Sequence, residues 1–283
     1  MRFGDFDLRL VNGGDFRLDG GAMHGVVPKT VWSRLVSCDD KNRCSYATNC
    51  LLIEGQGRRV LIETGNGDKF SPKEKDLYGI DHDRSVETNL AALGVEPASI
   101  DFVIMTHLHF DHSGGTTRRT ASGHAPIFPR ARHVIQAREW HDATHPHERN
   151  RASYLAENFA PLEDAGLVQR VEGEAEIAPG IRVIPTPGHT AGHQSVVISD
   201  GQGHTLVFFG DVIPTAVHLR LPYIMGYDLD VVGTLETKRA LLKRVEEERW
   251  LVVFGHELEH PSGYVGRDPK GNLVVTEPVS LSD

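Results

Sequence analysis

Short apolar stretches of strand length recur along the whole chain. They are rich in Val, Ile and Phe and end at Gly, Pro or Asp, which is the pattern of buried β-strands. The predicted strands cover residues 48–53, 60–63, 102–105, 133–136, 181–184, 195–198, 206–209 and 251–254.

Helical periodicity occupies several of the intervals between these strands. The predicted helices cover residues 85–93, 151–159 and 234–249. The third has the clearest apolar face, and Thr234 is its candidate N-cap. Because strands and helices are mixed along one chain, we expect an α+β protein in which helices cover a sheet core.

Two segments depart from this pattern. Residues 116–170 contain polar stretches rich in Arg and His, and we expect them to leave the core and help form a rim. Residues 12–30 are rich in glycine and predict a long loop, of a kind that is often functional. In that loop Phe16 and Met23 could form an apolar lid, or they could pack over a sheet edge.

Composition limits the classes of protein that fit. The chain has 283 residues, 39% hydrophobic and 24% charged, so we expect one globular domain over residues 1–283. The formal charge of −9 argues against a nucleic-acid partner. Neither an 18-residue apolar run nor a signal-peptide pattern occurs, so we expect a cytoplasmic protein without a membrane partner. The expected partner is a small-molecule substrate, and the sequence also permits a homodimer.

Three cysteines give no disulfide framework. Cys38, Cys44 and Cys50 are few, odd in number and spaced like no zinc site. We interpret them as reduced thiols, and Cys50 as a small apolar residue inside a buried strand.

Four predicted strands run directly into residue types that bind metals. Loops at strand ends are held by a rigid sheet and often form functional sites. The residues are His107, His109, Asp111 and His112 after the strand at 102–105, His189 after 181–184, Asp211 after 206–209, and His256 after 251–254. One His-x-His would be weak evidence, but the full set over four strand ends indicates a metal site.

The spacing in the first loop separates two groups of ligands. Residues i and i+2 of an extended chain face the same side, which puts His107 and His109 together. With His189 they would form one open zinc site. Three further residues, Asp111, His112 and His256, would form a second, and Asp211 would bridge the two ions. We therefore expect two divalent metal ions, with zinc as the first choice.

The order of these motifs resembles the metallo-β-lactamase superfamily. The matching strings are THLHFDH, TPGH, FFGD and FGH, and the resemblance extends from about Asn49 to His256. It implies an αββα four-layer sandwich, in which helices cover the outer faces of two mixed β-sheets. It also implies the seven ligands named above and a metal-bridging hydroxide that attacks the substrate.

Further roles follow from this resemblance. Asp111 and Asp211 become candidate catalytic residues, and Asp111 could carry a proton to the leaving group. The superfamily often has Asp in the string LIDTG, where this chain has Glu63 in LIETG. We expect Glu63 to orient a ligand histidine by a hydrogen bond. Loss of ligands would mark a catalytically dead binding protein, but all seven are present.

Among the branches, this chain most resembles the N-acyl-homoserine lactonases. The strings HLHFDH-x-GG and TPGH-x-x-GHQS occur in the same order, and aryl-ester and organophosphate hydrolases look next most similar. Thioesterases of this fold fit less well, because they usually append a longer helical region. The expected function is hydrolysis of a lactone or carboxylic ester, and phosphotriester, aryl-ester or thioester hydrolysis is the alternative.

One position departs from the lactonase pattern. Those enzymes usually have Tyr three residues after the bridging Asp, and this chain has Pro214, which lacks even an N–H donor. Either His218, Tyr223 or Tyr227 supplies a donor instead, or the second metal alone stabilises the oxyanion. We take His218 as the third candidate catalytic residue. We expect His193 to support the site or, alternatively, to contact the substrate, and His141, His145 and His147 to lie on the surface.

Overall fold

Two large β-sheets form the centre of the molecule. The computed structural model describes residues 1–80 and 84–281, and within them each large sheet has seven strands. The first runs in the order β1 (Arg2–Phe3), β2 (Phe6–Asp19), β3 (Arg43–Gly55), β4 (Arg58–Ile62), β5 (Phe102–Ile104), β8 (Arg132–Gln136) and β9 (Val168–Val171). The second runs in the order β10 (Ala175–Ala178), β11 (Ile181–Pro185), β12 (Gln194–Ser199), β13 (Thr205–Phe208), β14 (Leu251–Val253), β15 (Ser262–Arg267) and β16 (Leu273–Pro278). Strands β6 (Thr117–Thr120) and β7 (Gly123–Pro126) form a separate hairpin.

The helices are mostly short. The α-helices are α1 (Gly20–His24), α2 (Lys29–Trp32), α3 (Pro72–Tyr78), α4 (Val86–Ala92), α5 (Phe110–Ser113), α6 (Ala137–Thr144), α7 (Ala156–Asp164) and α8 (Val231–Glu247). Four 3₁₀ turns are also described, at Pro97–Ser99, Gly114–Thr116, Gly210–Val212 and Ala216–Leu219. Among the described residues, no helix is long and apolar enough to cross a bilayer.

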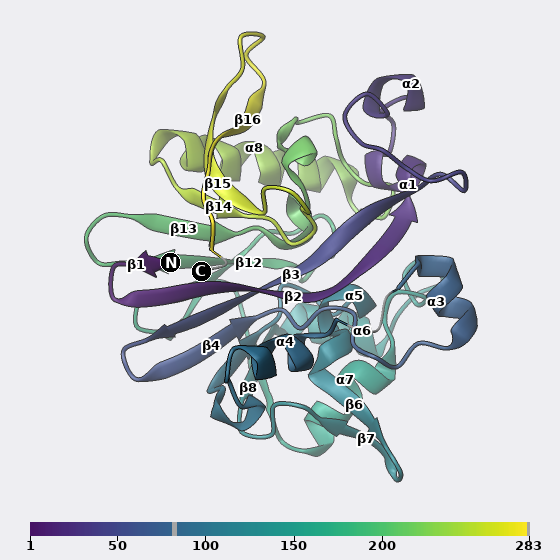
Figure 1. The fold of residues 1–283 in the computed structure, drawn as a ribbon, viewed down its shortest axis with the longest axis vertical. Coiled ribbons are helices and arrows are strands. Elements are labelled where there is room, and N and C mark those ends of the chain that lie inside the picture. Colours follow the sequence, from purple (N-terminus) through teal and green to yellow (C-terminus); the bar gives the residue numbers. More distant parts are fainter. Residues whose placement is uncertain (81–83, 282–283) are drawn as a thin grey trace.

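The layers follow from where the apolar side chains pack. One core cluster joins strands of both sheets, including Leu51 of β3 and Val196 of β12. A second cluster lies under α4 and α7, and a third under α8, where Leu241 and Val245 are buried. Figure 1 shows α8 beside β13–β15 and α4 and α7 beyond the opposite sheet. The αββα sandwich of two mixed sheets is therefore confirmed.

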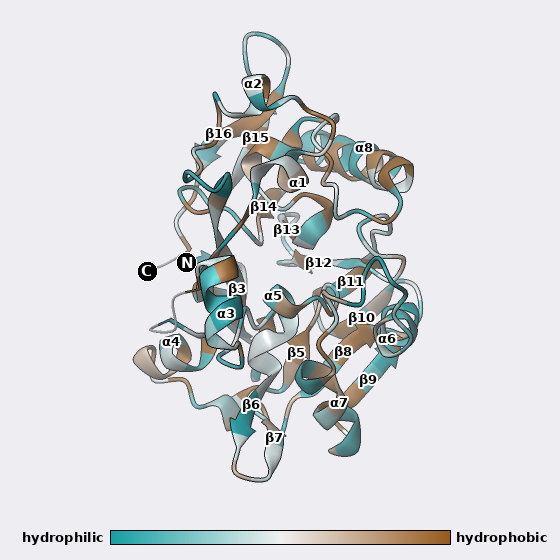
Figure 2. Ribbon diagram, turned by 90° about the vertical axis from the view of Figure 1, so that its right-hand side faces the viewer, coloured by the Kyte–Doolittle hydropathy of each residue, from teal (hydrophilic) through white to brown (hydrophobic). Residues whose placement is uncertain are grey.

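Hydropathy agrees with this layering. In Figure 2 the strands β5 and β8 are largely brown, whereas α6 at the periphery is largely teal. All eight strands predicted from the apolar pattern are present. Seven lie within a residue or two of the expected bounds, whereas the strand expected at 48–53 is the longer β3, which begins five residues earlier at Arg43. The helix expected at 85–93 is also confirmed as α4, which Ser85 caps.

Strand direction brings the candidate loops to one edge. In the second sheet β11, β13 and β14 point the same way, because β12 is antiparallel to both β11 and β13 while β14 is parallel to β13. Hydrogen bonds between the two sheets close this edge. Gln194 donates its backbone N–H to the carbonyl of Thr106 over 2.9 Å, and Asn49 donates to Gly255 over 2.7 Å.

The prediction of a long loop at residues 12–30, which was based on their glycine content, is wrong. Residues 12–19 of that segment belong to β2, which pairs with β3 from Phe6 to Asp19 and has a register shift between Asn12 and Asp15. Gly13 and Gly14 fall at this irregularity, and the pairing resumes at Asp15. Helix α1 follows immediately, capped by the Asp19 side chain.

Two helix starts and the rim segment also need correction. Helix α8 begins at Val231 with Asp230 as its N-cap, so Thr234 lies inside the helix. Helix α7 begins at Ala156, not at Arg151. The residues before it form turns, and the carbonyl of Ser153 accepts from Phe110 N–H. Within residues 116–170, β8 and β9 belong to the first sheet, so only the hairpin, α6, α7 and their loops leave it.

The cysteine interpretation is wrong in one respect. The structure joins Cys38 and Cys44 in a disulfide across the turn that precedes β3. A six-residue separation gives no pairing signal by itself, but pairing within the hairpin-like turn brings the two residues together. Cys50 is a free thiol that is fully buried in β3, as expected.

Candidate metal centre

The site begins where β5 ends. After Thr106 the chain stays extended through His107 to His109, which is the N-cap of α5. Helix α5 then holds Asp111 and His112, and the carbonyl of His112 accepts from the backbone N–H of Thr64 over 2.9 Å. All four ligand candidates of this loop are at most 7% exposed.

Two glycines let this loop pack tightly. A β-carbon at Gly114 would collide with the carbonyl of Asn66, and one at Gly115 with that of Thr64. The Ser-Gly-Gly sequence therefore allows the ligand loop to lie directly on the loop that follows β4, which also carries Glu63.

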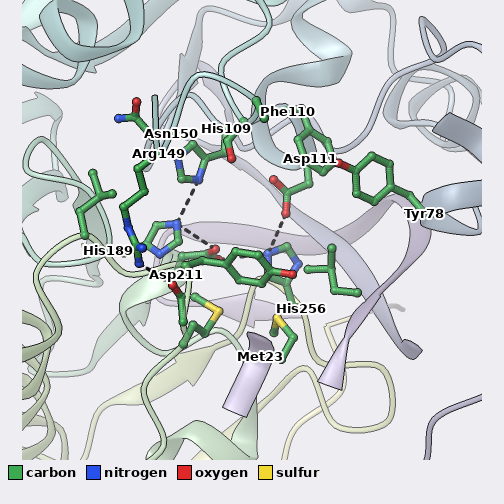
Figure 3. A pocket seen from close by; sticks show the side chains of 17 residues that line it. Met23, Tyr78, His109, Phe110, Asp111, Arg149, Asn150, His189, Asp211 and His256 are labelled. Carbon is green, nitrogen blue, oxygen red and sulfur yellow. Dashed lines mark hydrogen bonds and ion pairs between the residues drawn. The ribbon is translucent and has the colours of Figure 1, made fainter. Parts of the chain in front are cut away.

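The first expected ligand group assembles at this edge. His107, His109 and His189 place one ring nitrogen each within 4.8 Å of one another. Nε2 of His189 lies 3.1 Å from Nδ1 of His109. Figure 3 shows His189 facing both His109 and Asp211 from the pocket floor.

The second group lies beside the first. Asp111, His112, Asp211 and His256 also place one ligand atom each within 4.8 Å of one another. One carboxylate oxygen of Asp211 lies 3.0 Å from Nε2 of His256 and 3.4 Å from Nε2 of His112. The other lies 3.3 Å from Nε2 of His189. Asp211 thus faces both groups, which is the geometry that a bridging ligand requires.

The charges in this cluster depend on each other. Burial and the neighbouring histidines lower the pKa of His107 well below its usual value. For His112 burial opposes protonation, but the carboxylates of Asp211 and Asp111 outweigh it and raise the pKa. The pKa of Asp211 is held well below its usual value, because His256 and His112 overcome the effect of burial.

The residues present fit two divalent ions. Nε2 of His107 is buried and has no hydrogen-bond partner among the described residues, although its Nδ1 lies 3.0 Å from the Thr106 hydroxyl. Imidazole nitrogens and carboxylate oxygens are the ligands that zinc accepts. Where such nitrogens face one another at 3.1–3.2 Å, a shared cation would replace repulsion with coordination.

Three of the ligand imidazoles have a further polar partner on the side away from the ligand group. Nδ1 of His189 lies 2.8 Å from the Asp228 carboxylate, and Nδ1 of His256 lies 2.8 Å from the carbonyl of Ala47. Glu63 Oε2 lies 3.2 Å from Nδ1 of His112, in the orienting position expected for it. Such partners fix the ring and raise its basicity.

Two supporting residues were missed by sequence reasoning. Asp228 follows no motif, and only its burial beside His189 identifies it. Glu139 of α6 is fully buried and accepts hydrogen bonds from Leu108 N–H, Thr190 and Tyr154. It ties the first ligand loop to the loop of His189, and neither role has a signal in the local sequence.

His193 supports the bridging residue. Its Nδ1 lies 2.8 Å from the Thr186 hydroxyl, and its Nε2 accepts from the backbone N–H of Asp211 over 3.0 Å. Burial lowers the pKa of His193 to about 3, so the ring is neutral and can accept this bond.

His218 does not reach the pocket, and the catalytic role expected for it has no support. Its Nε2 lies 2.8 Å from the carbonyl of Met23 and its Nδ1 lies 2.8 Å from Thr215, so both ring nitrogens are engaged in the interior. Tyr223 is also buried away from the pocket, whereas Tyr227 lines it. His141, His145 and His147 are exposed, as predicted.

A cavity of about 370 Å³ opens above the two groups. Of the ligand candidates, His109, Asp111, His189, Asp211 and His256 reach its wall. The other lining side chains are mostly apolar or aromatic, among them Leu18, Met23, Tyr78, Phe110, Met225, Tyr227 and Leu229. Met23 thus lines the pocket, while Phe16 packs edge-on against His256 with ring centroids 5.3 Å apart. Arg149 and Asn150 complete the wall, and sequence reasoning had overlooked both.

Comparison with known families agrees with this arrangement. The metallo-beta-lactamase superfamily pattern matches residues 46–256, which is most of the chain. This chain belongs to the metallo-β-lactamase superfamily. Its homologues and structural neighbours are hydrolases, and this chain is a metal-dependent hydrolase.

Individual relatives make the likeness more specific. An N-acyl homoserine lactonase of a Bacillus species is 29% identical over 227 residues, covering 76% of this chain and 82% of that protein. The crystal structure of a probable metal-dependent hydrolase from Staphylococcus aureus is 29% identical and covers 99% of this chain and 100% of its own, with a TM-score of 0.89. The structure of the hydrolase AbOPH is 21% identical, covers 100% and 97%, and has a TM-score of 0.82, which shows the shared fold.

Proposed function

We propose that this chain is a dinuclear metal-dependent hydrolase that acts on lactones or simple carboxylic esters. The observation that carries the proposal is the position of Asp211, whose two oxygens face two adjacent ligand groups on the floor of a largely apolar pocket. The likeness to N-acyl homoserine lactonases at 27–29% identity supports this substrate class.

The seven ligands would hold the two ions, and zinc suits their nitrogen and oxygen donors. Bound there, the ions would lower the pKa of a bound water to near neutrality and would polarise the carbonyl oxygen of the substrate. The protein's part is to fix the ligands through Asp228 and Glu63, and to exclude bulk water with apolar walls.

Asp111 is the residue that we propose to move a proton. Its carboxylate reaches the pocket wall and lies 3.4 Å from Nε2 of His256. A carboxylate in this place can hold a proton and release it to the leaving oxygen as the ring or ester opens.

Tyr227 is the donor that we propose in place of the hydroxyl missing at Pro214. The carbonyl of Pro214 accepts from His256 N–H over 2.9 Å, so this residue supports the ligand loop and offers no donor. Tyr227 lines the pocket, and burial raises its pKa, which keeps its hydroxyl protonated and able to donate. A donor aimed at a developing oxyanion contributes about 10²–10³ in rate.

The test is a substrate panel on the zinc-loaded protein. We would measure kcat/KM for homoserine lactones of several acyl lengths, aryl esters, thioesters and phosphotriesters. The variants are Tyr227→Phe and, as a control at a partly buried tyrosine outside the pocket, Tyr264→Phe. We expect lactones or esters to lead, activity to vanish with a chelator and return with zinc, and only Tyr227→Phe to lose rate.

Other outcomes would redirect the proposal. Efficient turnover of phosphotriesters alone would favour the organophosphate branch, which shares the fold of AbOPH. A metal content well below two ions per chain after zinc supply would overturn the dinuclear site. A small-molecule partner, the absence of a nucleic-acid partner, a cytoplasmic location and a homodimer remain predictions of the sequence.

A further inference from the structure

The pocket has two chemically different ends. Tyr78 and Phe110 lie at one end, with ring centroids 4.9 Å apart. Arg149 and Asn150 lie at the other, beside His109 and His189, as Figure 3 shows. A substrate that spans the ligand groups would therefore meet an aromatic surface at one end and a cation with an amide at the other.

The Arg149 guanidinium is anchored through one nitrogen only. Its Nη2 donates to the carbonyl of Gly226 over 2.7 Å and, more weakly, to that of Asp228 over 3.4 Å. Among the described residues, Arg149 forms no ion pair with a carboxylate, and its Nε and Nη1 donate to no protein acceptor. Arg149 is exposed, so one nitrogen is anchored while the remaining donors face solvent at the mouth of the pocket. Arginine binds carboxylates and phosphates through such pairs of donors.

Asn150 adds a second unpaired group. It is 4% exposed, and its side-chain oxygen has no hydrogen-bond partner within residues 1–80 and 84–281. A buried polar group without a partner is unfavourable. By rotation of its amide Asn150 can present either NH₂ or oxygen to a ligand.

The other ionisable groups on the wall leave Arg149 as the charge available for recognition. The acids and histidines that line the pocket all belong to the two ligand groups. The two lining tyrosines, Tyr78 and Tyr227, stay neutral. Arg149 belongs to neither ligand group, so its positive charge would attract an anionic substrate to the pocket, although the formal charge of the whole chain is −9.

We propose that Arg149 and Asn150 form a specificity subsite for an anionic group, a carboxylate or phosphate, on the substrate. The proposal rests on the hydrolase function above and narrows its substrate class. The preferred substrate is an ester or lactone with an apolar group toward Tyr78 and Phe110 and an anionic group toward Arg149. Arg149 donates to the anion, and Asn150 donates or accepts beside it.

A purely structural role for Arg149 would behave differently. Its bonds to Gly226 and Asp228 join the loop before α7 to the loop before α8, and Asp228 in turn contacts His189. If that were its only task, replacing Arg149 would weaken turnover of charged and neutral substrates equally. The ratio of the turnover of charged substrates to that of neutral substrates therefore distinguishes substrate recognition from structural support.

The experiment uses zinc-loaded enzyme and aryl hexanoates that differ only in the para group. The group is carboxylate, phosphonate or the neutral carboxamide. We expect the native enzyme to favour an anionic ester, and Arg149→Gln to reduce that preference about threefold to fivefold, mostly through KM, because the ion pair is exposed to solvent. Arg149→Lys should restore part of it, because the charge stays while the paired donors are lost. Arg151→Gln, at an exposed arginine two residues away, is the matched control.

A binding arm uses the hexananilides that carry the same para groups and resist hydrolysis, with Kd measured by calorimetry. Loss of the anionic preference in Arg149→Gln, with Arg151→Gln unchanged, supports the subsite, and the carboxylate and phosphonate arms identify the anion. Equal losses for charged and neutral ligands, or no native preference, overturn it. If no ester is cleaved the proposed function fails, while the anilide ratios still decide the subsite.

Discussion

Removing the carboxylate behind His189 tests how the first ligand group is held. Asp228 is 2% exposed, and its Oδ1 lies 2.8 Å from Nδ1 of His189. A hydrogen bond to a charged group contributes about 1.5–3 kcal/mol, whereas a neutral one contributes about 0.5–1.5 kcal/mol. Asp228→Asn keeps an acceptor of the same shape but removes the charge, so the change is about 1–1.5 kcal/mol, or about fivefold to tenfold in metal affinity.

Asp228→Ala removes the acceptor as well. Loss of a partner behind a ligand histidine typically costs about 10–100-fold in metal affinity. Because His189 belongs to only one of the two groups, the weakening should fall on one ion. At limiting zinc the variant should therefore retain about one ion per chain where the native protein retains two.

Zinc competition against a chromophoric chelator at pH 7.5 gives the affinities, and elemental analysis after gel filtration gives the stoichiometry. Asp164→Asn is the control, since Asp164 is exposed at the end of α7. Thermal melts of the metal-free proteins show whether folding has changed. Native-like affinity of both ions in Asp228→Ala, with folding intact, would refute the supporting role of this carboxylate.

Three further results are expected. Asp211→Asn should lose about 10²-fold or more in kcat, because a neutral amide offsets less charge between the ions; near-native turnover with two ions bound would contradict the bridge. Glu139→Gln should lower the free energy of unfolding by about 1–3 kcal/mol, since an amide cannot accept all three bonds that Glu139 accepts, as urea titration would show. Burial lowers the pKa of His133 from 6.5 to about 4. The unfolded chain therefore binds a proton that the folded chain does not, and the free energy of unfolding should fall by about 2 kcal/mol from pH 7 to pH 5; in His133→Leu that part of the pH dependence should disappear, and its persistence would exclude His133 as the source.

The apolar pattern predicted most of the sheet strands, since it reports burial directly. Strands such as β5 and β14 are continuous apolar runs because helices or the second sheet cover both of their faces. The same pattern failed where glycine was taken to end a strand. The local sequence does not show that Gly13 and Gly14 lie at a register shift inside β2. The shift is defined by pairing with β3, and β3 begins only at Arg43.

The ligand set could be predicted because the spacing within a motif is local. His107 and His109 share a face of extended chain, and the following turn sends Asp111 and His112 elsewhere. Tertiary structure decided how the groups are supported. Asp228, Glu139 and Arg149 lie far along the chain from the groups they contact, and their residue types are common on surfaces. His218 shows the converse: its position after Asp211 looked favourable, yet packing against Met23 turned it inward.

Sequence alone thus determined eight of the fourteen strands described in the two large sheets, the seven metal-ligand candidates and the superfamily, because these depend on short-range periodicity and spacing. The pairing of β2 with β3, the disulfide between Cys38 and Cys44 and the two-ended pocket were decided only by the folded chain. The physical reason is that a buried hydrogen bond or an open pocket wall depends on which distant segments meet. That outcome reflects the packing of both sheets and their helices together, and no single stretch of the chain encodes it.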